Sequence, residues 1–300
     1  MARPLRSTST ADAGPAQPGR DRGPRRQPFQ SSALSNGLGS RVRAHSPLLA
    51  IDGLSKNFGG VRAVDKVSFQ VERGSIVGLI GPNGAGKTTT FNLISGRFAP
   101  SAGTVRLNGR SLTGLRPDQI AACGIARTFQ GTRIFPKLSV AENVQIAALA
   151  GLKLGFWADW LGLRAARHAE AVAGQRAAEI LEWVGLAPQA AATAGALAYA
   201  HQSMLGIALA LALRPQLVLL DEPFAGMNPG ETIQAAEMVR RIRDDGMTVV
   251  LVEHDVPAVM RICDRIVVLD QGVKIAEGTP AEIQADERVV EAYLGVDTDA

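Results

Sequence analysis

The chain has 300 residues, 46% of them hydrophobic, so it can bury one large core or two small ones. No stretch of about 18 or more apolar residues occurs, which excludes an ordinary membrane-spanning helix. The two cysteines, Cys123 and Cys263, lack metal-ligand spacing and favour a reduced cytoplasmic setting over a disulfide framework.

The net charge of +4 comes from the first 46 residues, which hold eight arginines against Asp12 and Asp21. This segment carries about +6 and the remainder about −2, so the high pI is a property of the tail. Low hydrophobicity with high charge cannot offset the entropy of ordering, and residues 1–46 are expected to form a disordered basic tail. A dispensable extension or a start assigned too far upstream is our favoured interpretation. Anionic lipid headgroups, nucleic acid and an organelle transit signal are the alternatives.

Residues 47–296 have the pattern of one α/β domain, followed by a short tail, 297–300. Three runs are predicted to form an antiparallel flank: 48–54, 67–72 and 103–107. Five runs are predicted to form the strands of a core sheet: 76–80, 125–129, 217–220, 248–252 and 265–269. The run 217–220 is apolar without alternation, as expected of a parallel strand buried on both faces. Helices are expected between several of these strands.

A phosphate-binding pattern, G-x-x-x-x-G-K-[ST], follows the first core strand. Between the apolar run 76–80 and a helix-like run the chain reads Gly81-Pro82-Asn83-Gly84-Ala85-Gly86-Lys87-Thr88, followed by Thr89. Glycines let the backbone wrap around phosphate, and consecutive amides with the helix N-terminus supply partial positive charge. Lys87 would reach the β- and γ-phosphates, and the Thr88 hydroxyl would ligate Mg²⁺. The segment predicts binding of a nucleoside triphosphate.

Most of the chain from the 125–129 strand to Ala200 has a helical pattern. Ser139 and Glu142 are spaced as a capping box. An amphipathic run, 175–184, ends at Gly185, a candidate helix C-cap. Three aromatic residues in this region are expected to form local core in preference to an exposed interface: Phe156, Trp157 and Trp160.

Two carboxylates follow the apolar run 217–220, at Asp221 and Glu222. Ligands of open α/β sheets bind along the carboxyl edge of the strands. Asp221 would hold Mg²⁺ through its water shell, and Glu222 would polarise an attacking water. Helix capping is the alternative role for these acids, and the phosphate-binding loop makes it the minority interpretation.

Over residues 48–295 these motifs resemble the nucleotide-binding subunit of an ABC transporter. The resemblance implies a P-loop, RecA-like core with an antiparallel β flank and a helical subdomain over about 131–213. It implies that ATP and Mg²⁺ are bound, and that Phe58 stacks on adenine. Gln130 would touch both Mg²⁺ and the attacking water.

The same resemblance implies roles for two further residues. Asn228 would lie in the loop that crosses a dimer interface. His254 would contact the γ-phosphate and join Glu222 and Gln130 as a catalytic residue. A satisfied core histidine is the alternative for His254, which its place between Glu253 and Asp255 after an apolar strand disfavours.

Three segments narrow the resemblance to an ATPase subunit of the branched-chain amino acid importers: 57–65, 225–229, and the ending at 277–280 with 290–295. The stretch 151–171 resembles an insertion in one of the two paired ATPases of these systems, and it disfavours a lipopolysaccharide-type exporter. Importers for urea, amides and other small polar solutes share these features and stay open as alternatives.

One motif departs from the family pattern. These importers usually read Leu-Ala-Tyr-Gly, then Gln and two arginines, where this chain reads Leu197-Ala198-Tyr199-Ala200-His201-Gln202-Ser203-Met204. In the family the motif caps the γ-phosphate of ATP on the partner subunit, so Ala198 and Ala200 would face the partner's ATP. A methyl group at Ala200 would crowd phosphate oxygens. Tolerated drift, an asymmetric pair with one weakened site, and a catalytically silent regulatory scaffold are all open.

The resemblance also implies partners. A second ABC ATPase subunit, identical or different, would complete the sites, and integral membrane permease subunits would be contacted through Gln130, Arg133 and Phe135. A periplasmic or extracellular solute-binding protein would act indirectly, and no nucleic-acid partner is expected. The subunit would be peripheral, at the cytoplasmic face of the inner membrane. A single such domain without long heptads disfavours translation-associated ABC proteins and chromosome-organising ATPases.

Overall fold

The computed structural model describes residues 47–128, 134–152 and 163–294. Several predictions lie outside these residues: the disordered tail 1–46, the roles of Gln130 and Arg133, the aromatic cluster at Phe156, Trp157 and Trp160, and the C-terminal tail 297–300. Within the described part of the chain, no helix has the length and apolar character needed to cross a membrane.

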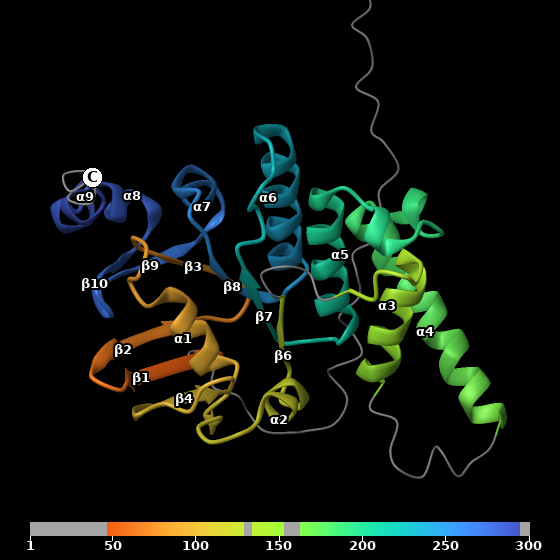
Figure 1. Cartoon of the computed structure of the whole chain (residues 1–300), viewed down its shortest axis with the longest axis horizontal. Helices are drawn as coiled ribbons and strands as arrows, with labels where there is room; N and C mark the ends of the chain where they lie inside the picture. Colours follow the sequence, from red (N-terminus) through yellow and green to blue (C-terminus); the bar gives the residue numbers. More distant parts are fainter. Residues whose placement is uncertain (1–46, 129–133, 153–162, 295–300) are drawn as a thin grey trace, which may run out of the picture.

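The larger of two sheets has six strands in the order β10-β9-β3-β8-β7-β6 (Figure 1). From β9 to β6 neighbouring strands are parallel, and β10 is antiparallel to β9. Strands β3, β7 and β8 are buried along their whole length, as their continuous apolar sequences predict. The bounds are β3 Ile76–Ile80, β6 Ile125–Arg127, β7 Leu217–Asp221, β8 Thr248–Val252, β9 Arg265–Asp270 and β10 Val273–Gly278.

The smaller sheet is the predicted antiparallel flank, with strand order β2-β1-β4-β5. Its strands are β1 Leu49–Phe58, β2 Val61–Val71, β4 Ala102–Leu107 and β5 Arg110–Ser111. The first two are longer than the predicted runs 48–54 and 67–72. Register shifts after Ile51 and Leu54 let pairing resume beyond Gly53, whose φ of 55° interrupts the regular ladder.

Alternate side chains of β3 enter two different cores. Ile76 and Ile80 belong to a core shared with the helices, whereas Val77 and Leu79 belong to a core shared with the antiparallel sheet. This division follows from the two-residue period of a strand, since successive side chains point to opposite faces. Both faces of β3 are therefore covered by packed side chains, and the loop at its carboxyl end starts from a buried strand.

Nine α-helices occur in the described residues: α1 Lys87–Ile94, α2 Pro117–Ala122, α3 Val140–Gly151, α4 Leu163–Val184, α5 Tyr199–Ala212, α6 Pro229–Asp244, α7 Val256–Ile262, α8 Pro280–Gln284 and α9 Glu287–Leu294. Helices α3, α4 and α5 pack together at the end of the molecule away from the antiparallel sheet (Figure 1). The predicted capping box is confirmed, since Ser139 N donates to Glu142 Oε2 at 2.7 Å and Glu142 N donates to Ser139 Oγ at 3.1 Å. α4 starts well before the predicted run 175–184 and ends, as predicted, before Gly185 at φ 81°.

Strand β10 and the short β5 were not predicted. β10 lies at the edge of its sheet, and its sequence, VKIAEG, lacks the continuous apolar character of the central strands. An edge strand pairs with a single neighbour and is partly exposed to solvent, so its amino-acid composition predicts a strand only weakly.

Asp264 fixes the position of β3 relative to α6. Its Oδ2 accepts a hydrogen bond from the buried Ile76 N at 2.7 Å, and its Oδ1 accepts one from Arg243 Nη1 at 2.7 Å.

We expect Asp264→Ala to lower the free energy of unfolding by about 1–3 kcal/mol, because it leaves the strand amide without its acceptor. Urea denaturation measures this loss. Asp244→Ala is the matched control, because it removes another carboxylate partner of Arg243 without touching β3; equal losses would contradict the role given to the strand amide.

Candidate functional site

The predicted phosphate-binding segment connects β3 directly to α1. β3 ends at Ile80 and α1 begins at Lys87, with Gly86 as its N-cap. The loop needs glycine at two places for close approach as well as for backbone conformation. A Cβ at Gly81 would lie 2.0 Å from the Leu269 carbonyl oxygen, and one at Gly86 would lie 2.5 Å from that of Ala63. The loop therefore lies close to both sheets, and a glycine-rich loop before a helix N-terminus is the kind of backbone that binds phosphate oxygens.

Lys87 is buried at the base of this loop. Its ammonium group donates to the carbonyl oxygens of Gly81 at 2.7 Å and Pro82 at 2.9 Å. Burial lowers the pKa of Lys87, and the nearby Glu222 carboxylate opposes this shift. Glu222 is near enough to act on the pKa of Lys87, so the two predicted motifs, far apart in the sequence, share one site. Thr88 is exposed and Thr89 half-buried in the first turn of α1.

Asp221 ends β7 and pairs with a residue that the sequence analysis did not single out. Its Oδ2 accepts from Arg127 Nη2 at 2.7 Å, and both side chains are buried, at 5% and 6% exposure. Its backbone N donates to Thr128 Oγ1 at 3.1 Å. An arginine within the predicted core strand 125–129 was the available signal, since a buried guanidinium requires a partner.

Glu222 and His254 are in direct contact. Glu222 Oε1 lies 2.9 Å from His254 Nε2. With an ionised carboxylate as the partner, Nε2 carries the hydrogen and donates it. The Glu222 backbone has a φ of 50°, unusual for a residue other than glycine, and its N donates to Val252 O at 2.9 Å.

Glu253 connects the two loops that carry these side chains. Its Oε1 accepts from Phe224 N at 2.6 Å, and its Oε2 accepts from His254 N at 3.1 Å. Only 3% of the residue is exposed. Burial raises the pKa of Glu253 to about 7, although the backbone donors favour its charged form. The contact of Glu253 with the loop that carries Glu222 was not predicted from the sequence, where Glu253 is recognisable only as a neighbour of His254.

The departing motif begins α5. Ala198 is the N-cap and offers no side-chain acceptor, so the first amides of the helix depend on other partners. Ala200 lies in the first turn and is half-buried. A Cβ at Gly226 would lie 3.3 Å from the exposed Tyr199 ring, which puts this motif beside the loop before α6.

Phe58 lies at the end of β1, next to a second aromatic ring. It is 42% exposed, and its ring centre is 5.2 Å from that of Phe98, in an edge-to-face arrangement. Lys56 Nζ lies 5.1 Å from the centre of the Phe58 ring. Phe98 supports one side of the exposed Phe58 ring, which suits the predicted stacking of Phe58 on a base.

Asn228 is the N-cap of α6. Its Oδ1 accepts from Glu231 N and its own N donates to Glu231 Oε2, both at 3.0 Å. The structure thus gives Asn228 a capping role that the sequence analysis did not assign. Its predicted place at a dimer interface stays a prediction.

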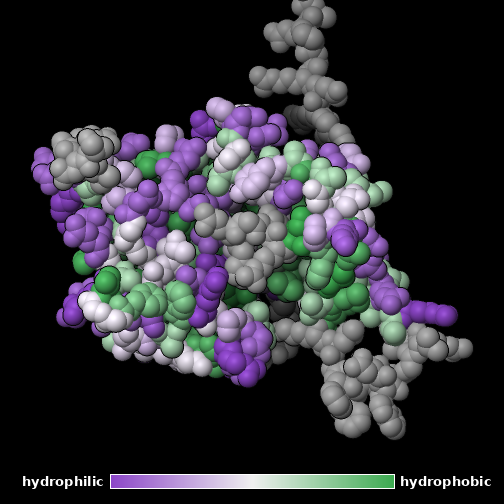
Figure 2. All heavy atoms as spheres, in the orientation of Figure 1, coloured by the Kyte–Doolittle hydropathy of each residue, from purple (hydrophilic) through white to green (hydrophobic). Residues whose placement is uncertain are grey.

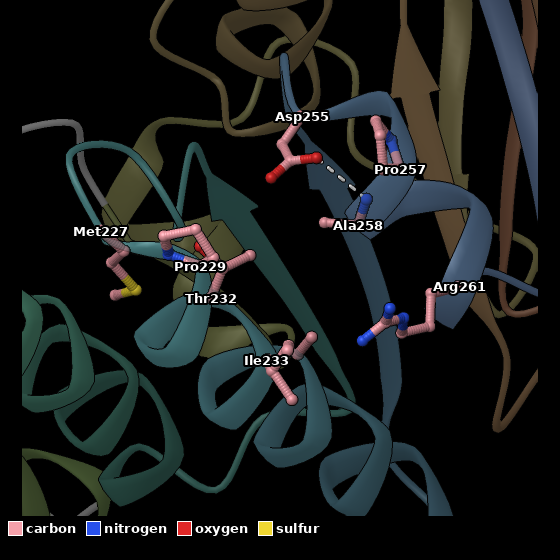
Figure 3. A pocket seen from close by; sticks show the side chains of 9 residues that line it. Met227, Pro229, Thr232, Ile233, Asp255, Pro257, Ala258 and Arg261 are labelled. Carbon is pink, nitrogen blue, oxygen red and sulfur yellow. Dashed lines mark hydrogen bonds between the residues drawn. The ribbon is translucent and has the colours of Figure 1, made fainter.

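A groove of about 260 Å³ lies beside these loops, between α6 and α7 (Figure 3). On one wall, Asp255 Oδ1 accepts from Ala258 N at 3.0 Å and caps α7. The lining residues are Met227, Pro229, Thr232, Ile233, Ala236, Asp255, Pro257, Ala258 and Arg261. None belongs to the phosphate-binding loop, so the groove flanks the candidate site.

Apolar side chains also gather on the surface over α3 and α5, as Figure 2 shows. Large exposed apolar residues in this part of the chain are Phe135, Ile146 and Leu213. An exposed apolar surface of this kind is a candidate contact for another protein.

Comparison with known proteins agrees with the geometry. Residues 64–225 match the family model described as "ABC transporter". Over 250 residues the chain is 45% identical to the high-affinity branched-chain amino acid transport ATP-binding protein LivG of Salmonella typhimurium, covering 83% of this chain and 98% of LivG. The chain belongs to the ABC transporter family, as an ATP-binding subunit.

Further matches define the branch of this ABC ATPase. Residues 273–299 match a family model described as "Branched-chain amino acid ATP-binding cassette transporter". The chain is 42% identical over 250 residues to BraF of Pseudomonas aeruginosa, a protein of the same description as LivG, with 83% of this chain and 98% of BraF covered. The resemblance stated from the motifs is confirmed: the subunit belongs to the branched-chain amino acid transport branch.

The predicted fold class of the ABC subunit is confirmed as well. The ADP conformation of MJ1267, an ATP-binding cassette of an ABC transporter, matches with a TM-score of 0.72 at 28% identity, covering 83% of this chain and 99% of MJ1267. The α/β core, the antiparallel flank and the helical part are the features expected of this fold.

The buried Glu253 carboxyl is expected to make the stability of the ABC subunit pH-dependent. Its pKa is about 7 in the folded chain, compared with an ordinary 4.5, so the folded state binds this proton more tightly than the unfolded state does. The stabilisation from this proton is therefore present at low pH and is lost as pH rises through 7. Relative to Glu253→Gln, which cannot titrate there, the wild type should lose up to about 3 kcal/mol between pH 4.5 and 7.5.

Urea denaturation of both proteins at several pH values measures this change. Glu237→Gln, at an exposed carboxyl on α6, is the control for losing an acid elsewhere. A constant difference between wild type and Glu253→Gln across this range would show that Glu253 does not titrate there.

Proposed function

We propose that this ABC ATPase binds ATP with Mg²⁺ and hydrolyses it as one half of a dimer, driving uptake of branched-chain amino acids. The observation that carries the proposal is the convergence of Lys87, Asp221, Glu222 and His254 at one edge of the sheet. LivG and BraF, the relatives named for this transport, and the match at residues 273–299 support the choice of solute. Urea, amides and other small polar solutes are the alternatives.

The residues of the site have separable roles in this proposal. The loop amides and the Lys87 ammonium bind the β- and γ-phosphates. Glu222 orients an attacking water and accepts its proton. His254 donates Nε2–H, at present to Glu222, and a γ-phosphate oxygen would compete for that donor. Gln130, proposed to assist, lies outside the described residues.

The donor set fits Mg²⁺, which prefers hard oxygen ligands and retains several waters. The Thr88 hydroxyl would bind the ion directly, and the Asp221 carboxylate would hold it through bound water. When bound, Mg²⁺ neutralises charge on the phosphates.

We also propose that the apolar surface over α3 and α5 meets the cytoplasmic helices of the permease, with Phe135 among its contacts. The subunit would then be peripheral, at the cytoplasmic face of the membrane. The loop around Asn228 and the start of α5 would face the second ATPase subunit, whose identity is open. A solute-binding protein would act on the complex indirectly.

Replacing the general base tests the hydrolytic role. We expect Glu222→Gln to lower kcat by at least about 10²-fold, since the amide cannot accept a proton from water. Affinity for a fluorescent ATP analogue should stay within about 2-fold, because the phosphate-binding groups are retained. Asp118→Asn, at an exposed carboxylate on α2, is the matched control. Unchanged phosphate release in Glu222→Gln would exclude Glu222 as the base.

A second candidate, an asymmetric pair with one weakened ATP site, rests on Ala200. Its place in the first turn of α5, where free amides would meet the partner's phosphate, puts a methyl group where the family usually has glycine. Loss of one contact to developing charge costs about 10²–10³ in rate by analogy with oxyanion donors. This chain's own Lys87, Glu222 and His254 are present, so the weakened site would be the partner's.

Restoring glycine tests this candidate. We expect Ala200→Gly to raise steady-state hydrolysis by the purified chain, by up to about 10²-fold, and to lower helix stability by about 0.5–1 kcal/mol. Ala178→Gly, at an exposed position of α4, controls for the helix effect alone. Hydrolysis rates equal to wild type in Ala200→Gly would mean that the substitution is tolerated drift.

A further inference from the structure

Arg127 is a buried cation that the proposed reaction has not used. It lies on β6, the edge strand next to β7. Its Nη2 donates to Asp221 Oδ2 at 2.7 Å, and its Nη1 donates to Asn92 Oδ1 and Ser95 Oγ, both at 2.8 Å. Its guanidinium carbon also lies 5.7 Å from the centre of the Phe91 ring.

These contacts join two separate parts of the site. Phe91, Asn92 and Ser95 lie at the end of α1 or directly after it, and the first turn of the same helix carries Thr88. Asp221 lies on a different element, at the end of β7. One guanidinium therefore fixes the Asp221 carboxylate relative to the helix that carries the Thr88 hydroxyl.

We infer that Arg127 is a positioning residue for the metal site: it holds Asp221 in register with Thr88 so that the two can share one Mg²⁺ ion. The inference rests on the proposed function, in which these residues hold Mg²⁺. Arginine suits the task because its planar fork can donate to partners on two elements at once. A lysine has the same charge but presents one ammonium group, which cannot keep both sets of contacts at these distances.

Two other roles have different consequences. A purely structural ion pair would matter for stability and leave metal binding alone, since breaking a buried pair leaves an uncompensated charge. A purely electrostatic role would weaken Mg²⁺ binding, because a cation beside the site repels another cation. In that case removing the charge would tighten metal binding, and retaining it in a lysine would change nothing.

The test is a Mg²⁺ titration of the full-length chain with a fluorescent ATP analogue, starting in EDTA. We compare wild type, Arg127→Lys and Arg127→Gln, and record thermal unfolding of each. In both variants the Mg²⁺ concentration for half-maximal tightening should rise about 10- to 100-fold. Affinity for the analogue in EDTA should stay within about 2-fold, because the phosphate-binding loop is intact.

Two additional variants keep the test decisive if Arg127→Gln does not fold. Ser95→Ala removes one anchor on the α1 side and leaves the Asp221 contact, so it should shift the titration in the same direction by less. Arg243→Lys alters an ion pair that also joins two elements, at Asp264, away from the site, and should leave the titration unchanged.

Three outcomes would overturn the inference. An unchanged Mg²⁺ titration with a lower melting temperature would make Arg127 a structural partner only. Tighter Mg²⁺ binding in Arg127→Gln, with Arg127→Lys like wild type, would make its role one of charge. A wild type whose analogue binding does not respond to Mg²⁺ would overturn the proposed metal site itself, and the inference with it.

Discussion

The parallel register of β3, β8 and β7 is the constraint on which the rest of the site depends. Val252 is the register partner of both Leu79 and Asp221, so the three strands end at nearly the same level. The residues that follow each strand therefore emerge side by side: the glycine loop, Glu222, and Glu253 with His254. Backbone hydrogen bonds between neighbouring strands hold this alignment, and apart from Asp221 and Thr248 the strand side chains are apolar and buried. The one or two residues that follow β7 and β8 carry polar side chains of the candidate site.

This arrangement explains why much of the site could be predicted from the sequence. A glycine-rich loop and a pair of acids are recognisable because each follows an apolar run, and strands of that kind are buried at the centre of parallel sheets. Local chemistry also made the capping box at Ser139 predictable.

The rest depended on contacts that sequence patterns do not encode. Arg127 and Asp221 are 94 positions apart in the sequence, and nothing local indicates their pairing. Glu253 was visible only as a neighbour of His254, since its second partner is a backbone amide in another loop. The bulges in β1 likewise depend on pairing with the neighbouring strands. They let the strand continue beyond Gly53, a residue type that usually indicates the end of a strand.

The backbone at Glu222 has a consequence for anyone who redesigns this chain. A left-handed conformation costs a non-glycine residue about 1–3 kcal/mol, and it is maintained here with an amide hydrogen bond to β8. A procedure that optimises stability alone would replace this residue by glycine or asparagine, and would be correct by its own criterion. The substitution would relax the turn and remove the proposed base. At this position, the most stable sequence and the working sequence differ.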